Sequence, residues 1–313
     1  MYEVRWALTP HCNFDCSYCR PGGEGIFNDT KPLNVEEIGQ CGELLAENGY
    51  DSVRLTGGEP MMRRDLMEII DRLDAVEGID SISMVTNGSL LTEEKIERLV
   101  DSALGSLTVS LDTLDGERYQ AMIRTRARWF EKVLQNIAEA SKAGLNMRIN
   151  VVVTRDNASD LPQFHAFCEE HGVDLKLLDL NNNGMNDWNE QYVDFGPIRD
   201  AVRERAVGES VSNVRGGMGT PMTVFDMGNH NVIIKDSQSG TFYADACRSC
   251  EHYPCQTGIS SPIVTHDGRI KMCNLGEASD FSLIDLVRHR RAFESFNEVF
   301  RSASFTSAWG DVG

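Results

Sequence analysis

The sequence predicts an α/β protein in which a parallel barrel, or part of one, is followed by a smaller C-terminal domain. Strand-like and helix-like segments alternate over residues 3–179, which is typical of βα units. Polar and glycine residues stand at the C-terminal end of nearly every predicted strand. Because the loops at that end of a parallel barrel converge on one mouth, the chemistry is expected there. A doubly wound sheet is the alternative arrangement.

Each expected element has a local signal. Strands are expected at 3–9, 52–56, 81–85, 106–110, 148–154 and 174–179, and helices at 36–48, 65–73, 93–100, 130–143 and 161–170. Gly49 and Gly144 follow two of these helices, and Thr92 is placed to cap a third. The regular alternation ends after Leu180, so we expect one domain over 1–209 and a second over 210–313.

The second domain is expected to hold short, irregular elements. A helix is predicted at 197–206, before this domain begins. Within the domain we expect a glycine-rich irregular segment at 211–219, short antiparallel strands within 224–235 and 241–244, and a terminal helix at 283–300. A hairpin is predicted from 262–265 and 269–272 around Asp267 and Gly268.

Composition limits the class of protein. The chain has 313 residues, of which 41% are hydrophobic, and this is enough for a large domain and a smaller one. A net charge of −18 argues against nonspecific nucleic-acid binding. With no export signal and no long apolar run, we expect a cytoplasmic protein with no membrane segment. Seven of the nine cysteines form two groups, and Cys41 and Cys168 are interpreted as ordinary buried thiols.

The first cysteine group is a CxxxCxxC loop made by Cys12, Cys16 and Cys19 directly after the first predicted strand. Its short spacers suit a loop wrapped around one cuboidal iron–sulfur cluster. Three thiolates on such a cube leave one iron open to an outside ligand. A zinc site usually pairs CxxC with a second CxxC or with two histidines, and an odd number of thiols does not suit a disulfide framework.

With Tyr18 just before its last cysteine, this loop resembles that of the radical S-adenosylmethionine (SAM) enzymes. The resemblance implies a partial (β/α)6 TIM-like barrel with a small C-terminal auxiliary-cluster domain. It implies a [4Fe–4S] cluster whose open iron chelates the amino and carboxylate groups of SAM, and cleavage of SAM to a 5′-deoxyadenosyl radical. An electron donor such as ferredoxin or flavodoxin is implied as a partner.

The segment Gly57-Gly58-Glu59-Pro60 follows the second predicted strand and fits the SAM-binding pattern of that superfamily. Glycines allow close backbone approach, and the Glu59 carboxylate is suited to accept a charge-assisted hydrogen bond from the methionine ammonium. The resemblance adds Tyr18, Thr86 and Ser110 to the expected cofactor-binding residues.

The second cysteine group consists of Cys247, Cys250, Cys255 and Cys273. Four-thiolate zinc is one interpretation, because CxxC with two further cysteines also describes a zinc knuckle. A second, auxiliary [4Fe–4S] cluster is the interpretation that the resemblance favours.

A closer resemblance is carried by the segments 19–26, 54–60, 110–115, 149–153 and 265–269. They are similar to the GTP 3′,8-cyclase family, which begins molybdenum-cofactor biosynthesis. In that family a C-terminal cluster contacts the GTP base through an iron that no cysteine ligates. The cationic positions that match are Arg5, Arg54, Arg148 and Lys176, and these are the expected substrate-binding residues.

The departures from that family concern the substrate. Cys255 is additional here and would close the free iron. Glu251-His252-Tyr253 stands where the family has an Asn-Arg-x-Arg run, Ser52 replaces a lysine, and the end of the chain, 309–313, lacks the family's paired glycines. Fewer cations make tight triphosphate binding unfavourable, because each phosphate requires charge-assisted donors.

We therefore expect a radical SAM enzyme that abstracts hydrogen from a nucleotide-like or sugar-like small molecule, leading to cyclisation or carbon–carbon bond formation. GTP 3′,8-cyclase activity is an alternative, and so is a peptide-modifying radical SAM enzyme with an auxiliary cluster. A zinc-stabilised binding protein is the alternative from outside enzymes.

Overall fold

The computed structural model describes residues 2–17, 19, 30–182, 188–213, 218–276, 278–289 and 304–306. Six parallel strands follow the order of the chain across one sheet, each pairing with the next. They are β1 (Tyr2–Ala7), β2 (Tyr50–Thr56), β3 (Ser81–Thr86), β4 (Leu104–Ser110), β5 (Met147–Val152) and β6 (Asp174–Leu178). A doubly wound sheet would reverse this order part of the way across. The partial barrel is therefore confirmed, and the doubly wound alternative is wrong.

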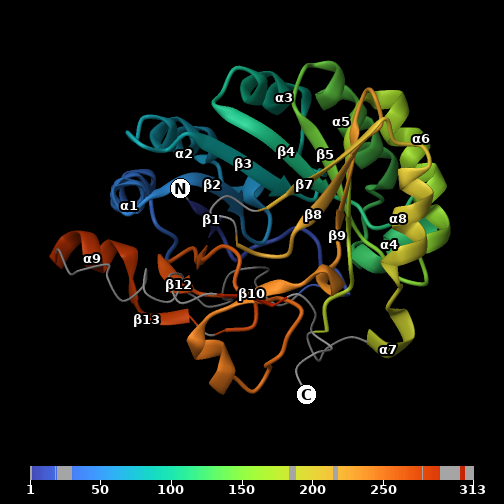
Figure 1. Cartoon of the computed structure of the whole chain (residues 1–313). Coiled ribbons are helices and arrows are strands. Elements are labelled where there is room, and N and C mark those ends of the chain that lie inside the picture. Colours follow the sequence, from blue (N-terminus) through green and yellow to red (C-terminus); the bar gives the residue numbers. More distant parts are fainter. Residues whose placement is uncertain are drawn as a thin grey trace.

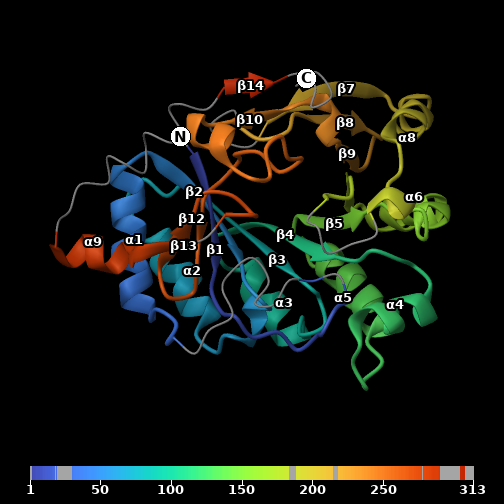
Figure 2. The same cartoon turned by 90° about the horizontal axis from the view of Figure 1, so that it is seen from below.

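Helices follow the strands and pack on the outside of the barrel (Figures 1 and 2). They are α1 (Val35–Glu47), α2 (Leu66–Asp74), α3 (Glu93–Val100), α4 (Gly116–Ile123), α5 (Phe130–Lys142) and α6 (Leu161–His171). At the start of α1, the Asn34 side chain accepts from the Glu37 amide and the Glu37 carboxylate accepts from the Asn34 amide. Thr92 caps α3, as predicted. Helix α4 is an element that the sequence interpretation lacked.

The two faces of the barrel strands differ in chemistry. Along β3, β5 and β6 every second residue is buried. Apart from Thr86 these residues belong to the hydrophobic core beneath the helices, for example Met84, Ile149 and Leu175. The alternate positions are half-buried and largely polar, for example Asn150 and Lys176. Because side chains alternate between the faces of a strand, the polar set lines the inside of the barrel.

Beyond β6 the sheet continues with β9 (Asn231–Lys235), β8 (Met222–Asp226) and β7 (Gly208–Ser212). Strand β9 is parallel to β6, whereas β8 is antiparallel to both β9 and β7. The expectation of an irregular segment at 211–219 is wrong for the end of β7, and the boundary expected at 209/210 falls inside that strand. Two helices, α7 (Trp188–Gln191) and α8 (Phe195–Arg203), precede it.

At the other end, the sheet continues outward from β1 with β11 (Ile263–Val264), β12 (Arg269–Lys271) and β13 (Ala278–Ser282). The predicted hairpin is formed by β11 and β12, and β11 pairs with β1 in parallel, with Arg5 opposite Ile263. A separate two-stranded sheet joins β10 (Thr241–Tyr243) to β14 (Ser304–Thr306). The predicted terminal helix begins as α9 (Leu283–His289), and its expected remainder lies outside the described residues.

Short 3-10 turns at Pro60–Met62, Ala158–Asp160, Ser237–Ser239 and Asp245–Ser249 complete the described elements. None of the helices in the described ranges is long and apolar enough to cross a membrane.

Candidate active site

The Cys12–Cys19 loop leaves the C-terminal end of β1, at the barrel mouth. Cys12 and Cys19 are exposed, Cys16 is half-buried, and all three thiols are free. The Phe14 amide donates to Cys12 Sγ at 3.4 Å, and the Cys19 amide donates to the Cys16 carbonyl at 3.1 Å. Burial raises the pKa of the Cys12 thiol. Three thiols on one loop are a donor set that suits an iron–sulfur cube.

Helix α4 holds this loop in place. The last carbonyls of a helix lack partners within the helix, and here those of Met122 and Ile123 accept the Ser17 amide at 2.9 Å and the Asp15 amide at 3.1 Å. Phe14 packs against Tyr119 of α4 and against Trp129, with ring centroids 6.4 and 6.3 Å apart. Helix α4 therefore supports the loop, and the sequence interpretation missed this helix. Its start could have been recognised from Asp115, which caps it.

The two glycines after β2 pack against the cysteine loop. The Gly58 amide donates to the Thr9 carbonyl at 2.7 Å, and the Glu59 amide donates to the His11 carbonyl at 2.8 Å. A Cβ on Gly58 would stand 2.2 Å from the His11 carbonyl oxygen, and Gly57 has φ +148°. Neither position accepts a side chain without moving the backbone. The glycines were expected to let a ligand approach, and the contact that the structure shows is with the cysteine loop itself.

The Glu59 side chain lies beneath this contact and is 1% exposed. Its carboxylate accepts from the Thr86 hydroxyl at 2.7 Å, the Asn87 amide at 2.7 Å and the Met61 amide at 3.0 Å. Burial raises its pKa, and these three donors together with the charge of Lys95 oppose that rise. Glu59 thus joins the segment after β2 to the end of β3.

Of the other expected cofactor-binding residues, Thr86 is buried beside Glu59 and Ser110 is half-buried at the end of β4. Tyr18 lies outside the described residues. The Ser110–Asp115 segment also connects β4 to its neighbours. Asp112 accepts the Val152 amide at 2.7 Å, and Thr113 donates to Asp160.

The four expected substrate-binding cations lie on strands that surround the barrel interior. Arg54 forms an ion pair with Glu3 at 2.7 Å, and Arg148 forms one with Asp174 at 3.3 Å. Arg5 is buried and donates to the Ser261 carbonyl at 3.4 Å. Arg54 and its partner Glu3 both act on the charge of Lys176.

Lys176, Arg54, Arg148 and Lys235 form a group that we call the cation cluster. The pKa of Lys176 is lowered well below that of an ordinary lysine by burial and then by the charges of Arg54, Lys235 and Arg148. Lys235, at the end of β9, was not among the expected residues. Its strand was interpreted as part of an antiparallel pair outside the barrel, and only the parallel β6–β9 pairing brings it to this face.

The second cysteine group gathers beside the mouth on short elements. Burial raises the pKa of Cys247, and the charges of Cys255, Cys273 and Cys250 raise it further. The Gly258 amide donates to Cys255 Sγ at 3.4 Å, and the Gly276 amide donates to Cys273 Sγ at 3.2 Å. A backbone amide directed at a thiol suits a thiolate that ligates a metal.

In the parts of the chain that the structure describes, no three Cys, His, Asp or Glu side chains are arranged to hold a metal ion. The fit of both cysteine groups to clusters therefore rests on their donor sets and on their place in the fold.

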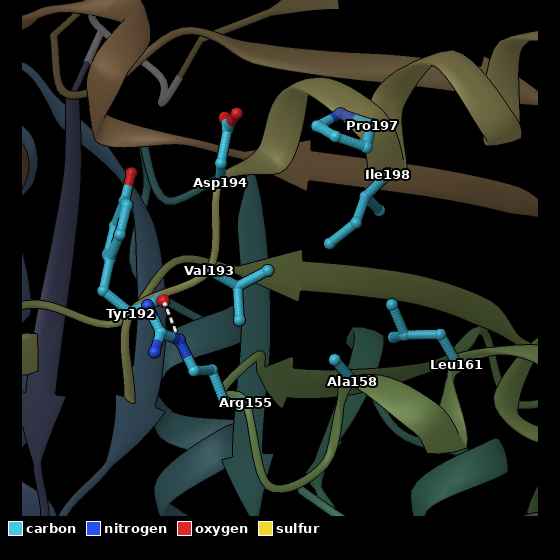
Figure 3. Close-up of a pocket in the computed structure, with 8 residues that line it drawn as sticks. All are labelled: Arg155, Ala158, Leu161, Tyr192, Val193, Asp194, Pro197 and Ile198. Atoms are coloured by element: carbon cyan, nitrogen blue, oxygen red, sulfur yellow. Dashed lines mark hydrogen bonds between the residues drawn. The ribbon is translucent and has the colours of Figure 1, made fainter. Parts of the chain in front are cut away.

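A separate hollow of about 470 Å³ lies between the start of α6 and the segment before α8 (Figure 3). Its walls are mostly apolar, with Arg155, Tyr192 and Asp194 at the polar positions. The Arg155 guanidinium donates to the Tyr192 carbonyl at 3.3 Å. None of its lining residues belongs to the cysteine groups or to the cation cluster, so we do not place the chemistry there.

A parallel barrel with three thiols after its first strand, packed against paired glycines after its second, defines an enzyme that generates radicals from SAM. Residues 6–168 match the family model of the radical SAM superfamily, and the chain belongs to that superfamily. Its cofactors are accordingly a [4Fe–4S] cluster and SAM, and the alternative of a zinc-stabilised binding protein without redox chemistry is set aside.

More particularly, the chain is similar to GTP 3′,8-cyclases. It is 32% identical over 306 residues to a probable GTP 3′,8-cyclase of Sulfurisphaera tokodaii, covering 96% of this chain and 90% of that one. It is 29% identical over 275 residues to a GTP 3′,8-cyclase of Lactiplantibacillus plantarum, covering 86% and 78%. It is 31% identical over 304 residues to molybdenum cofactor biosynthesis protein 1 of the mouse, covering 95% of this chain and 44% of that one. The class is thus a radical SAM enzyme of the lyase or cyclase type.

Solved structures agree in fold. SuiB of Streptococcus suis with bound SAM has a TM-score of 0.62 at 16% identity, covering 91% of this chain, which spans 64% of SuiB. The structure of anSMEcpe with SAM and a peptide also has a TM-score of 0.62, at 15% identity, covering 96% and 83%. At this level of identity the likeness concerns the fold alone.

Proposed function

We propose that this enzyme abstracts hydrogen from a small nucleotide-like anion held inside the barrel, between the Cys12–Cys19 loop and the second cysteine group, for cyclisation or carbon–carbon bond formation. The observation that carries the proposal is the cation cluster around Lys176. A lysine whose pKa is lowered by three neighbouring cations lies in a place where an anion would be stabilised. The radical would be formed at the adjacent mouth, within reach of a substrate bound there.

The size of the positive charge favours a modest anion. Of the cations in the cluster, Arg54 and Arg148 already have carboxylate partners in Glu3 and Asp174. Because carboxylates of the protein balance part of the positive charge, the cluster suits one phosphate or a similar group better than three. GTP 3′,8-cyclase activity is the second candidate, and the names of the similar proteins favour it.

We propose further that Cys247, Cys250, Cys255 and Cys273 bind an auxiliary [4Fe–4S] cluster, and that Cys255 closes it. Tyr243 supports this, because its hydroxyl donates to the Cys255 carbonyl and its ring packs on Tyr253 at 5.0 Å between centroids. Gln256, next to Cys255, is buried and accepts the Asn182 amide, which anchors this cysteine to the loop after β6. Four thiolates leave no iron open to a purine. One electron per turnover would come from a small carrier such as ferredoxin or flavodoxin.

The test is to incubate the reduced enzyme and SAM with nucleoside mono- and triphosphates, including GTP, and to measure 5′-deoxyadenosine above the level formed without substrate. We expect a monophosphate to stimulate most. Stimulation by GTP alone, with the 3′,8-cyclised product, would establish the second candidate instead.

Charge variants test the binding site. Arg54→Gln is expected to raise the KM for the stimulating nucleotide by at least about tenfold, as loss of a charge-assisted contact worth about 1.5–3 kcal/mol requires. SAM cleavage without substrate should be unchanged. Arg128→Gln, which removes the same charge from a side chain that is 76% exposed, is the matched control. An equal effect of both variants would contradict the interior site.

A further inference from the structure

Asn87 follows β3 and connects three segments of the mouth. Its backbone amide donates to Glu59 in the segment after β2 at 2.7 Å. Its side-chain nitrogen Nδ2 donates to Asn13 Oδ1 at 3.0 Å and to Cys12 Sγ at 3.8 Å, both in the cysteine loop. The contact with Glu59 uses only the backbone of Asn87, so the side-chain contacts can be removed without losing it.

The orientation of the Asn87 amide is fixed by a neighbour that can only donate. The Ser89 backbone amide donates to Asn87 Oδ1 at 3.0 Å, and the Ser89 hydroxyl donates to the same oxygen at 2.6 Å. Because a backbone N–H offers no lone pair, the atom that faces it must be the oxygen of the Asn87 side chain. The nitrogen is consequently the atom that faces the thiol of Cys12.

A closed ring of side chains supports this orientation. Asn13 Nδ2 donates to the Ser89 hydroxyl at 2.9 Å, Ser89 donates to Asn87, and Asn87 returns to Asn13. Each side-chain amide has two N–H groups. One N–H of Asn87 completes the ring with Asn13, and the second is available to Cys12 Sγ. The ring joins the cysteine loop to the end of β3. The contacts of Asn87 with the Ser89 amide and with Asn13 do not depend on the Ser89 hydroxyl.

We infer that Asn87 is a positioning residue that donates an N–H···S hydrogen bond to the Cys12 thiolate and thereby raises the reduction potential of the SAM-binding cluster. Hydrogen bonds to cysteine sulfurs are among the factors that set the potential of iron–sulfur clusters. A donor beside the sulfur stabilises the additional negative charge of the reduced state, and the bond strengthens when the sulfur is ionised. The Phe14 amide supplies a second donor to the same sulfur, and as a backbone group it remains in every side-chain variant. This role is independent of the identity of the substrate.

The test is a redox titration of the reconstituted full-length enzyme, followed by electron paramagnetic resonance without SAM. The component whose spectrum changes when SAM is then added identifies the SAM-binding cluster. Asn87→Ala removes the donor, and Asn87→Asp keeps the shape and the contact with the Ser89 amide but replaces the N–H by a charged oxygen. Ser89→Ala is the matched control, because it breaks the ring at its hydroxyl and leaves both the Ser89 amide and the Asn87 donor.

We expect the potential to fall in Asn87→Ala, to fall further in Asn87→Asp, and to stay near the wild-type value in Ser89→Ala. Unchanged or higher potentials in both Asn87 variants would overturn the inference, and so would an equal fall in Ser89→Ala. If both Asn87 variants keep the wild-type circular dichroism but bind no SAM-binding cluster, the residue serves cluster assembly and the inference is also overturned.

Discussion

The Cys12–Cys19 loop leaves a six-residue strand of the barrel, whereas the second cysteine group lies on turns that follow strands of three residues. The first loop is held from three sides, by the carbonyls of α4, by the Gly57–Gly58 backbone and by the Asn13–Asn87–Ser89 ring. The second is held mainly by backbone amides directed at its own sulfurs and by Tyr243. The first site is therefore preorganised by the fold, whereas the second site depends in part on its bound metal cluster for its structure.

The largest effect is expected from removing a thiol of the first loop. Cys16→Ala should reduce the cleavage of SAM to 5′-deoxyadenosine to background, because a cube with two protein ligands cannot keep its open iron in place. Cys250→Ala should retain cleavage without substrate and lose product formation, because its thiol belongs to the other group. The measurement is 5′-deoxyadenosine by chromatography after dithionite reduction. Full cleavage by Cys16→Ala would show that the first loop does not hold the SAM-binding cluster.

A metal count of a variant lacking Cys12, Cys16 and Cys19 sharpens the comparison. After anaerobic reconstitution it should retain roughly four irons per chain, the content of one cube. The measurement is iron, sulfide and zinc analysis of the purified variant. Zinc without iron would show that the second group is a structural zinc site.

Two glycine variants should affect the two sites separately. A Cβ at position 58 would meet the backbone of His11 at 2.2 Å, and one at position 258, where φ is +55°, would meet the carbonyl of Phe242 at 2.6 Å. Gly58→Ala should lower iron only at the first site and Gly258→Ala only at the second, by about half or more. Gly228→Ala, with φ +98° and nothing within 4 Å, controls for backbone strain alone. Equal losses at both sites in either variant would contradict separate scaffolds.

The smallest effect concerns Lys176 on β6. The folded-state pKa of Lys176 is lowered by burial and by neighbouring cations, so the folded enzyme binds fewer protons there than the unfolded chain between that pKa and the ordinary lysine value. The stability of the ligand-free enzyme should therefore rise with pH across this interval. Lys176→Met should stabilise the ligand-free enzyme by about 1 kcal/mol, seen as a higher melting temperature.

Substrate binding should show the opposite dependence. An anion in the cluster restores the pKa of Lys176, so binding takes up a proton and weakens as pH rises through the same interval. Titration calorimetry in buffers of different ionisation enthalpy measures this uptake, and Lys176→Met should abolish it. An uptake that persists in the variant would place the anion elsewhere.

The barrel could be predicted from the sequence because the signals that mark its strands and helices are local. Each strand ends in polar or glycine residues, and a cap such as Thr92 marks where a helix begins. Helix α4 was missed because it is short and follows a polar segment, although Asp115 signals its start. Strand β7 was missed because all five of its residues are exposed, so it has no hydrophobic alternation.

The site was less predictable where it depends on distant pairing. Lys235 enters the cation cluster only through the parallel alignment of β9 with β6, and no local pattern states which strand is the neighbour. The role of Asn87 depends on Ser89 and on Asn13 in another loop. By contrast, Cys12, Cys16 and Cys19 were found at once because their spacing alone fits the geometry of a cube.

The pairing of β1 with β11 has a consequence for synthesis of the chain. β1 is made first, yet its neighbour on one side contains Ile263 and Val264. At roughly 5–20 residues per second, translation takes on the order of ten seconds or more to supply that neighbour. During this interval the cysteine loop has already left the ribosome while its strand has an open edge, which is prone to pair with other chains. The cysteine loop can therefore receive its cluster before the edge of β1 is covered. The edge can be covered only after translation has reached β11.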